Sequence, residues 1–470
     1  MNQYQEIFDR LRQRAPLLAR TSAAERIAKL RRLQQAVYDL RAEIGAAGTA
    51  ELGQDGRAQM VPLKAKFDDV AVNLARWMER AEAAPNPALM GRRGYTQYEP
   101  KGVVLHLATW NAPMLISLSP VISMLAAGNA VLLKPSEIAP LAAEIVEQII
   151  ARADLGGDVA VVKGGPEVAQ ELLKLPFNHI CYVGNNRIGR LVMTAAAQHF
   201  ADVTLEMGGK NPIVVAADAD LDDTAGKIVY GRHLVGGQAC LCPDYILADA
   251  AIKDQLAARI VEKITAFYNP TGAGIQASRD LPRIINQRHT QRIKGLIDDA
   301  VAKGARVLTG GTVDVANRFV SPTLLEGITE EMDIFQEEIF GPVISIQAVA
   351  SRDAAIAEIE KRPKPLGFYV FTRSREVADW YLDHTRAGSS AVNNIATQAL
   401  SPSLAFGGVN HSGIGRLGGH AGFQEFSNPR GVVEDALEPS TGTPMMYPPY
   451  PVGIEAFLDT LLAPDPLPGA

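Results

Sequence analysis

Residues 179–206 read HICYVGNNRIGRLVMTAAAQHFADVTLE, and this stretch determines the fold class. Its two apolar runs, residues 179–183 and 203–206, are typical of short buried strands. The stretch between them, residues 187–199, has the length and composition of a single helix. A strand, a helix and a second strand in this order form the unit of a parallel sheet covered on both faces. The stretch therefore predicts a doubly wound α/β domain.

The same alternation extends in both directions from this stretch. Upstream we expect strands at 103–108, 131–134 and 159–162 and helices at 114–127, 138–153 and 167–175. Downstream we expect strands at 343–348 and 368–372 and helices at 353–361 and 375–384. Apolar residues at helical spacing before residue 95 predict amphipathic helices. We divide the chain into an N-terminal helical region (1–95), a doubly wound domain (96–207), a second α/β domain (208–404), a return segment (405–440) and a tail (441–470).

Composition narrows the class of protein. The 470 residues include 46 Lys and Arg against 52 Asp and Glu, so a nucleic-acid partner is not expected for lack of a basic surface. The odd cysteine count, with Cys181, Cys240 and Cys242, argues against a disulfide framework and favours a reducing compartment. The first ten residues lack the pattern of a secretory signal, so we expect the chain in the cytoplasm.

One segment has the length of a membrane span. Residues 102–133 contain no Asp, Glu, Lys or Arg, but Trp110, Asn111, Pro113 and Pro120 interrupt them. We therefore expect two buried strands and an apolar helix there, and no stable membrane anchor in the chain.

Gly236-Gly237-Gln238-Ala239-Cys240 is the first candidate for chemistry, because its glycines allow a sharp turn that would present the thiol to a cleft. A lone cysteine is more often an inert buried side chain, and that alternative stays open at this point. Cys242 and His233 could complete part of a metal site, but a fourth ligand at normal spacing is absent. No metal is expected.

Other polar groups follow predicted strands. Glu206 ends a strand, where ligands gather in open α/β sheets and a carboxylate can act as a general base. Asn111 follows the first strand and could donate to an oxyanion, or could form an Asx turn. The turn from Gly184 to Gly189 matches neither G-x-G-x-x-G nor a P-loop, so a packing role is an equal alternative. Residues 337–342 alone indicate only a charged turn.

Taken together and in this order, the motifs from about Pro100 to Val433 resemble the aldehyde dehydrogenase superfamily. The matching runs are Thr109-Trp110-Asn111-Ala112-Pro113, Lys134-Pro135-Ser136-Glu137, Gly184 to Gly189, Glu206-Met207-Gly208-Gly209-Lys210, Gly237-Gln238-Ala239-Cys240, Glu338-Ile339-Phe340-Gly341-Pro342, and Phe406-Gly407-Gly408-Val409 with Ser412-Gly413-Ile414-Gly415. The resemblance implies a Rossmann-like cofactor domain, a second α/β catalytic domain and a small oligomerisation arm, in a homodimer with an exchanged strand. It also implies NAD(P)-dependent oxidation of an aldehyde to the acid.

The resemblance assigns roles to three catalytic residues. Cys240 would be the nucleophile that forms a thiohemiacetal and then a thioester. The Asn111 amide and the Cys240 N–H would hold the oxyanion. Glu206 would deprotonate the water that hydrolyses the thioester.

Cofactor contacts follow by the same resemblance. Thr109 and Trp110 belong to the cofactor-binding set, and Lys134 and Glu137 would meet the adenosine ribose. The Gly184 to Gly189 turn would face the pyrophosphate. Glu338 and Phe340 would position the nicotinamide and its ribose. A carboxylate at Glu137 repels a 2′-phosphate, so we expect NAD, with NADP as the alternative.

Within the superfamily the chain looks like the class 3 branch, which includes fatty, aromatic and coniferyl aldehyde dehydrogenases. Cys240-Leu241-Cys242-Pro243-Asp244-Tyr245, Lys364-Pro365-Leu366 and the tail Tyr447-Pro448-Pro449-Tyr450 carry this likeness. The chain departs from the commoner branches, which have an aromatic residue where Ala112 stands and an Arg shortly after the nucleophile. An apolar or aromatic aldehyde is therefore the expected substrate. We expect the final helix, residues 452–462, to dock on the protein rather than on a membrane.

The sequence leaves three alternative functions open. An acylating dehydrogenase would pass the thioester to coenzyme A, but it would not need the base Glu206. A non-catalytic dinucleotide-binding or structural protein would not need the set Cys240, Glu206 and Asn111. A thiol hydrolase would leave the motifs at Lys134 and Glu338 unexplained.

Overall fold

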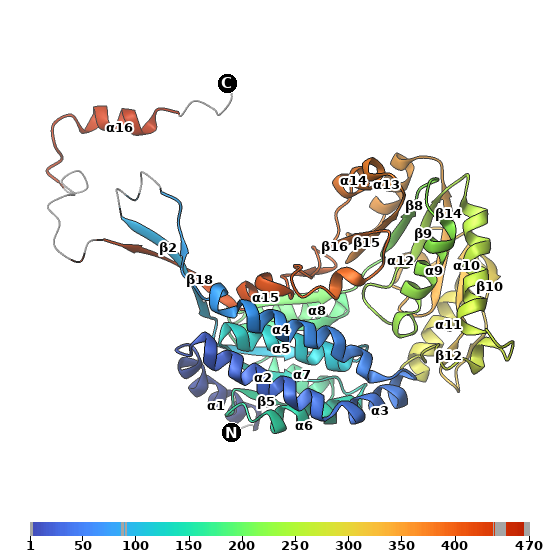
Figure 1. Ribbon diagram of the computed structural model, residues 1–470, viewed down its shortest axis with the longest axis horizontal. Helices are drawn as coiled ribbons and strands as arrows, with labels where there is room; N and C mark the ends of the chain where they lie inside the picture. The colour runs from blue at the N-terminus through green and yellow to red at the C-terminus, as the bar shows by residue number, and fades with distance from the viewer. Residues whose placement is uncertain (1–2, 86–88, 90–91, 436, 438–447, 465–470) are drawn as a thin grey trace. The chain divides into compact units, whose positions relative to one another are not determined.

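The computed structural model describes residues 3–85, 89, 92–435, 437 and 448–464 (Figure 1). The chain forms two compact units. The first unit takes its described residues from 1–79 and 98–428 and contains two large sheets. The second unit takes its described residues from 80–97 and 429–470.

A six-stranded sheet lies in the first half of the chain, with the order β17-β7-β6-β3-β4-β5. Its strands are β3 (Val103–Leu107), β4 (Ala130–Lys134), β5 (Val159–Val161), β6 (His179–Gly184), β7 (Asp202–Met207) and β17 (Gly413–Ile414). Strands β3 to β7 are parallel, and only β17 pairs antiparallel, with β7. The predicted doubly wound sheet is confirmed.

Helices cover both faces of this sheet (Figure 1). One face packs on α1 (Gln3–Leu18), α7 (Pro166–Leu172) and α8 (Asn186–Ala197). The other face packs in a core formed with α2 (Ala23–Asp39), α3 (Arg41–Leu52), α4 (Met60–Trp77), α5 (Pro113–Ala127), α6 (Pro140–Ala153) and α15 (Gly419–Glu425). Helix α7 ends three residues before the predicted end at 175, because Pro176 disfavours helical backbone in the residue that precedes it.

The uncharged segment, residues 102–133, forms β3, α5 and most of β4, as expected. Proline at the first position of α5 fits a helix start, and Gly128 ends the helix in the left-handed region, with φ of 92°. Among the described residues, no helix has both the length and the hydropathy that crossing a membrane requires.

A seven-stranded sheet lies in the second half of the chain, with the order β10-β13-β14-β9-β8-β15-β16. Its strands are β8 (Pro212–Val215), β9 (Tyr245–Asp249), β10 (Arg306–Thr309), β13 (Thr323–Glu326), β14 (Val343–Val349), β15 (Gly367–Phe371) and β16 (Ser389–Val392). Only the β10–β13 pair is antiparallel. The associated helices are α9 (Leu221–Arg232), α10 (Lys253–Tyr268), α11 (Gln287–Ala302), α12 (Asp333–Gln336), α13 (Arg352–Glu360) and α14 (Arg375–His384), with a small ribbon of β11 (Val313–Asp314) and β12 (Phe319–Val320).

The remaining strands form a three-stranded sheet with the order β1-β2-β18, and most of it belongs to the second unit. Its strands are β1 (Ala81–Glu82), β2 (Arg93–Pro100) and β18 (Ser427–Glu434), and helix α16 (Ile454–Leu462) follows in the tail. That this helix docks on the protein stays a prediction. The side chains of Phe457, Leu458 and Leu462 are 38%, 46% and 78% exposed. Tyr447 and the side chain of Leu461 lie outside the described residues.

Asp158 is a fully buried carboxylate at the start of β5, away from the carboxyl ends of the strands. It accepts hydrogen bonds from Arg14 of α1, at 2.7 Å, and from Lys29 of α2. Two cations thus neutralise one buried charge and join two helices to the sheet.

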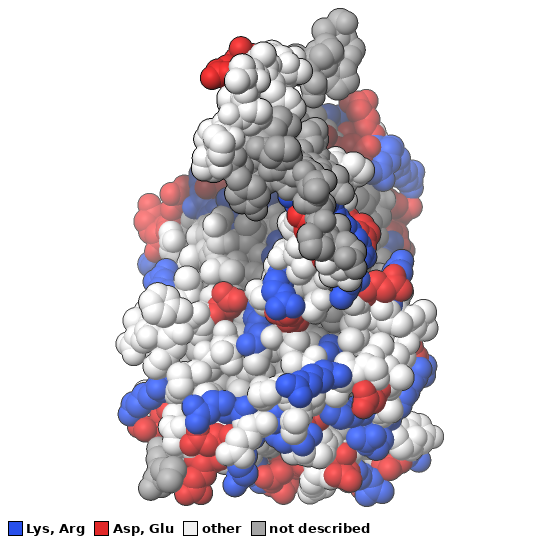
Figure 2. Space-filling model, turned by 90° about the vertical axis from the view of Figure 1, so that its left-hand side faces the viewer, with Lys and Arg blue, Asp and Glu red and all other residues white. Residues whose placement is uncertain are grey.

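Charges of both signs mix on the protein surface. Figure 2 shows Lys and Arg side chains interspersed with Asp and Glu side chains over the face it presents. This mixture agrees with the net charge of −6.

Candidate active site

The carboxyl ends of the parallel strands bring several predicted site residues to one edge of the six-stranded sheet. Lys134 ends β4, Gly184 ends β6 and Glu206 is the second-last residue of β7. Asn111 follows β3 by a short loop. Ligands of open α/β sheets bind at this edge, so the sheet topology alone explains why residues far apart in sequence meet there.

Cys240 lies on a loop that follows helix α9 and the 3₁₀ turn Leu234–Gly237. Val235, Gly236 and Gly237 all have positive φ, at 50°, 68° and 79°. A Cβ on Gly237 would lie 2.3 Å from the backbone oxygen of Gly341, so this position requires glycine. The predicted sharp turn before the thiol is therefore present.

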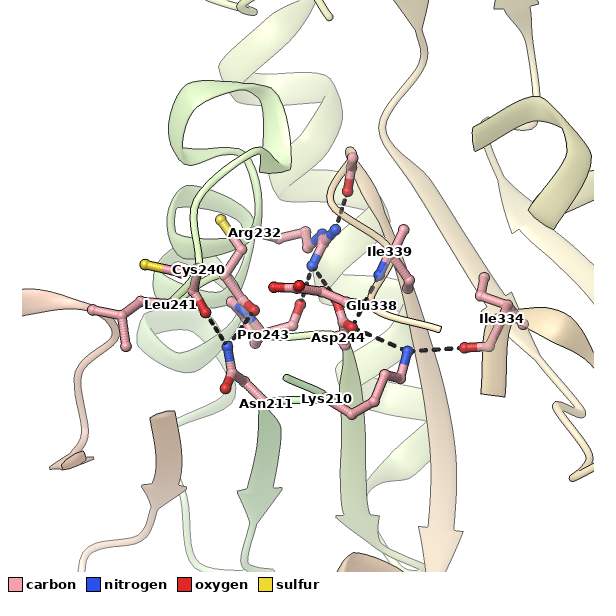
Figure 3. A network of polar contacts seen from close by, with 12 residues as sticks. Lys210, Asn211, Arg232, Cys240, Leu241, Pro243, Asp244, Ile334, Glu338 and Ile339 are labelled. Atoms are coloured by element: carbon pink, nitrogen blue, oxygen red, sulfur yellow. Dashed lines mark hydrogen bonds and ion pairs between the residues drawn. The ribbon is translucent and has the colours of Figure 1, made fainter. Parts of the chain in front are cut away.

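Asn211 holds the Cys240 loop from below (Figure 3). Its Nδ2 donates to the backbone oxygens of Cys240, at 2.7 Å, and Cys242, at 3.0 Å. Its Oδ1 accepts from the Gly367 N–H at 2.8 Å. The sequence analysis assigned no role to Asn211. Its position directly after the Glu206 motif could have indicated that it lies near the site.

The Glu206 carboxyl is buried and Cys240 is partly exposed, and each group affects the pKa of the other. Burial raises the pKa of Glu206 to about 7, while the hydrogen-bonding interaction with Cys240 lowers it in part. Burial, followed by the negative charge of Glu206, raises the pKa of the Cys240 thiol well above its ordinary value. Glu206 Oε1 is buried and has no hydrogen-bond partner among the described residues, so it can accept a proton.

Asn111 is a second polar group at this edge, and only 5% of it is exposed. Within the part of the chain that the structure describes, the Asn111 amide and the Cys240 N–H make no hydrogen bonds. The alternative that Asn111 forms an Asx turn therefore finds no support. Both donors are available to an oxygen atom of a ligand.

Glu338 and Phe340 lie on the segment that leads into β14. Burial raises the pKa of Glu338 to about 8, and the negative charges of Asp244 and Glu206 add to this effect. A Cβ on Gly208 would meet the Glu338 carboxyl, so this carboxyl packs on the backbone that follows Glu206.

Phe340 has a φ of 48° and packs edge-on against Trp110, with ring centroids 5.5 Å apart. Trp110 is 7% exposed and also contacts the His289 ring at 5.1 Å. The predicted cofactor residues Trp110 and Phe340 therefore lie together. Thr109, which precedes Trp110 in the sequence, is partly buried. His289 is an addition to the predicted set.

Lys134 and Glu137, the residues predicted to meet the adenosine ribose, form an ion pair at 3.1 Å. The Lys134 ammonium is buried and the Glu137 carboxylate is 38% exposed. An ammonium donor next to a carboxylate acceptor fits the two hydroxyls of a ribose.

The Gly184 to Gly189 turn leads into helix α8. Asn185 caps this helix by accepting from the Ile188 N–H at 3.0 Å. First-turn N–H groups have no partner within a helix, which fits phosphate oxygens. A Cβ on Gly189 would lie 2.5 Å from Met207 Sδ, so this glycine also allows α8 to approach β7 closely. The donors and acceptors along this edge thus suit a dinucleotide.

The remaining thiols lie away from a metal-binding arrangement. Cys181 is fully buried on β6, and the Cys242 thiol donates to the backbone oxygen of Leu234 at 3.6 Å. His233 Nδ1 is 2.6 Å from the Val229 oxygen. The described residues contain no cluster of three or more His, Cys, Asp or Glu side chains that could hold a metal ion.

Comparisons with known proteins agree with this arrangement. The model of the aldehyde dehydrogenase family matches residues 2–432. The chain belongs to the aldehyde dehydrogenase family. It is 36% identical over 430 residues to "Aldehyde dehydrogenase, dimeric NADP-preferring" of Rattus norvegicus, covering 91% of this chain and 93% of the relative. It is also 36% identical to "Aldehyde dehydrogenase family 3 member A2" of Mus musculus, covering 90% and 87%.

Solved structures with similar folds also include aldehyde dehydrogenases. The substrate-bound state of Staphylococcus aureus AldH has a TM-score of 0.91 at 30% identity and covers 98% of this chain and 100% of its own. PnpE in complex with nicotinamide adenine dinucleotide has a TM-score of 0.84 at 25% identity and covers 92% and 90%. The predicted superfamily and class 3 resemblance, the fold class and NAD(P)-dependent aldehyde oxidation are confirmed.

Proposed function

We propose that this aldehyde dehydrogenase oxidises an apolar or aromatic aldehyde to its carboxylic acid, with Cys240 as the nucleophile and Glu206 as the base. The observation that carries this proposal is the buried Glu206 carboxyl near the carboxyl end of β7, whose Oε1 has no hydrogen-bond partner among the described residues and whose pKa responds to Cys240. A buried carboxyl with a pKa of about 7 can accept a proton at neutral pH and release it again.

In the first step the Cys240 thiol loses its proton to bulk water, and Cys240 Sγ forms a bond with the carbonyl carbon of the aldehyde. The electron pair of the C=O double bond moves to oxygen. The Asn111 amide and the Cys240 N–H are the two donors available to the resulting oxyanion. Loss of one such donor typically costs about 3 kcal/mol of transition-state stabilisation.

The second step removes hydride from the thiohemiacetal carbon and leaves a thioester on Cys240. Bound NAD(P)+ supplies the hydride acceptor. Glu206 then takes a proton from water, the water oxygen attacks the thioester carbon, and the carbon–sulfur bond breaks. The products are the carboxylic acid and the Cys240 thiolate, which takes up the proton that Glu206 holds. Transfer to coenzyme A would not require this base.

The cofactor would lie along the edge of the six-stranded sheet. Lys134 and Glu137 would hold the adenosine ribose, and the Gly184 to Gly189 turn would face the pyrophosphate. Thr109, Trp110, Glu338 and Phe340 would contact the nicotinamide end. We propose NAD as the preferred form, because a Glu137 carboxylate repels a 2′-phosphate. NADP remains the alternative, and one relative is named NADP-preferring.

The substrate class rests on Ala112, which follows Asn111 and precedes helix α5. A methyl group at this position leaves more room than an aromatic side chain beside the oxyanion donors. Ala112 and Leu115 are partly exposed, so they can contact a substrate. These features favour a bulky apolar group on the aldehyde.

We also propose a cytoplasmic homodimer. Strand β18 is an edge strand of the three-stranded sheet, and most of its residues are exposed, so it can pair with a second copy of the chain. The rat relative is named dimeric. Three free cysteines favour a reducing compartment. Sedimentation of the full chain at micromolar concentration would detect a dimer, and a monomer would contradict this assignment.

The test of the activity is absorbance at the band of reduced nicotinamide, recorded with NAD or NADP and a panel of aliphatic and aromatic aldehydes. We expect an NAD-dependent signal that Cys240→Ser abolishes. Absence of a signal with every aldehyde, or full activity in Cys240→Ser, would overturn the proposal.

A further inference from the structure

Arg232 connects two segments of the site that are far apart in sequence. We define the nucleophile loop as residues 236–243 and the cofactor segment as residues 337–342. Arg232 is fully buried, and its Nη1 donates to the Pro243 oxygen, in the nucleophile loop, at 2.6 Å. Its Nη2 donates to the Gly341 oxygen, in the cofactor segment (Figure 3). One rigid guanidinium therefore binds both segments.

Asp244 completes this connection from the end of the nucleophile loop. Its Oδ1 accepts from Arg232 Nη1 at 2.7 Å, and its Oδ2 accepts from the Ile339 N–H at 3.2 Å. Lys210 Nζ lies 3.0 Å from the same Oδ2 and donates to the Ile334 oxygen at 2.8 Å. A buried carboxylate with two cations and a backbone donor is a fully paired group.

The two segments also touch directly. Gly237 and Gly341 approach so closely that a Cβ on Gly237 would lie 2.3 Å from the Gly341 oxygen. A shift of either segment must therefore move the other or break buried hydrogen bonds of Arg232 and Asp244, which is unfavourable. This geometry connects the residues around Cys240 to those around Glu338 and Phe340.

We propose that Arg232 and Asp244 are positioning residues that couple the orientation of the Cys240 thiol to occupation of the cofactor site beside Glu338 and Phe340. This inference rests on the proposed function, which assigns those three residues to the nucleophile and the cofactor site. Binding of NAD at the cofactor segment changes the reactivity of the thiol through the buried network. Because coupling between two binding events is reciprocal, modification of the thiol changes the affinity for NAD by the same factor.

The test measures the rate at which iodoacetamide alkylates Cys240, followed by mass spectrometry of the Cys240 peptide, with and without saturating NAD. For the native sequence we expect the two rates to differ at least about fivefold, a usual size for such coupling. Arg232→Lys keeps the charge but cannot bind both segments at once, and Asp244→Asn removes the charge that both cations share. In both variants we expect the ratio of the two rates to approach one.

Calorimetry with NAD, performed on the same proteins, separates coupling from binding. Both variants should still bind NAD. If NAD alters alkylation in the variants as much as in the native protein, NAD acts by direct contact with the thiol and the inference is wrong. If NAD does not alter alkylation of the native protein at all, the inference is also wrong, whether or not the variants fold.

Asp158→Asn is the matched control, because Asp158 is also a buried carboxylate held by two cations, Arg14 and Lys29. It lies at the start of β5 and touches neither segment. Its alkylation ratio should equal that of the native protein. An equal loss of the ratio in this control would show general loosening and overturn the inference. Failure of the proposed function is distinguishable, since then NAD would not bind or iodoacetamide would not label Cys240.

Discussion

The Glu206 carboxyl and the Cys240 thiol each affect the pKa of the other, and loss of solvation shifts the pKa of both upward. Glu206, with a pKa of about 7 instead of 4.5, is mostly protonated below pH 7 and mostly ionised above it. Only the ionised form accepts a proton. We therefore expect kcat to increase about tenfold per pH unit below about pH 7 and then level off.

The pH dependence can be checked with the steady-state rate at saturating NAD and aldehyde between pH 5.5 and 9. Glu206→Gln provides the comparison, because its remaining slow turnover should lack this ionisation. A native profile that is flat through pH 7 would contradict the role of Glu206 as the base.

Asn111→Ala removes one of the two proposed oxyanion donors. We expect kcat/KM to fall about 10²- to 10³-fold, because one donor contributes about 3 kcal/mol. Alkylation of Cys240 by iodoacetamide in the absence of aldehyde should stay near the native rate, since no oxyanion forms in that reaction. Equal losses in both measurements would show that Asn111 acts on the thiol or on the fold.

Asn211→Ala leaves three backbone groups without this partner, the buried ones at Cys242 and Gly367 and the partly buried one at Cys240. The free energy of unfolding should decrease by about 3 kcal/mol, measured by urea titration. The activity per folded molecule should decrease as well, because the nucleophile loop loses its support.

Asn129→Ala is the matched control for this variant. Asn129 is fully buried and also bonds three backbone groups, at Gly102, Met124 and Phe426, none of them in the nucleophile loop. It should lose similar stability but keep its activity per folded molecule. If the two variants lose activity equally, Asn211 has no specific effect on Cys240.

Glu137→Gln removes the negative charge that is expected to repel the 2′-phosphate of NADP. The ratio of kcat/KM for NADP to that for NAD should rise about tenfold or more. Glu144→Gln is a comparison on helix α6, where Glu144 pairs with Lys163, and should leave the ratio unchanged. An unchanged ratio in Glu137→Gln would exclude this residue from cofactor selection.

The strands and helices around the site follow from local pattern. Apolar runs of four to six residues, each before a single helix, were sufficient to predict β3, β4, β6 and β7 and hence a shared carboxyl edge. Glu206 could be singled out for this reason, because a carboxylate at the end of a buried strand has few structural uses.

Other features depend on contacts between distant segments, which a single sequence does not reveal. The hydrogen bonds of Asn211 and the junction of Arg232 with Gly341 form only when separate elements pack together. The partner of the tail helix is another such feature, because an apolar face predicts burial but not the surface that provides it.

The central claim is that a covalent acyl intermediate forms on Cys240 and that Glu206 promotes its hydrolysis. Intact mass spectrometry of Glu206→Gln tests this claim most directly. The variant is mixed with NAD and a reactive aldehyde such as benzaldehyde, and the reaction is stopped with acid. We predict one equivalent of reduced cofactor in a burst and a mass increase of one acyl group, located on the Cys240 peptide. Undiminished steady turnover without an acyl group on Cys240 would contradict the account.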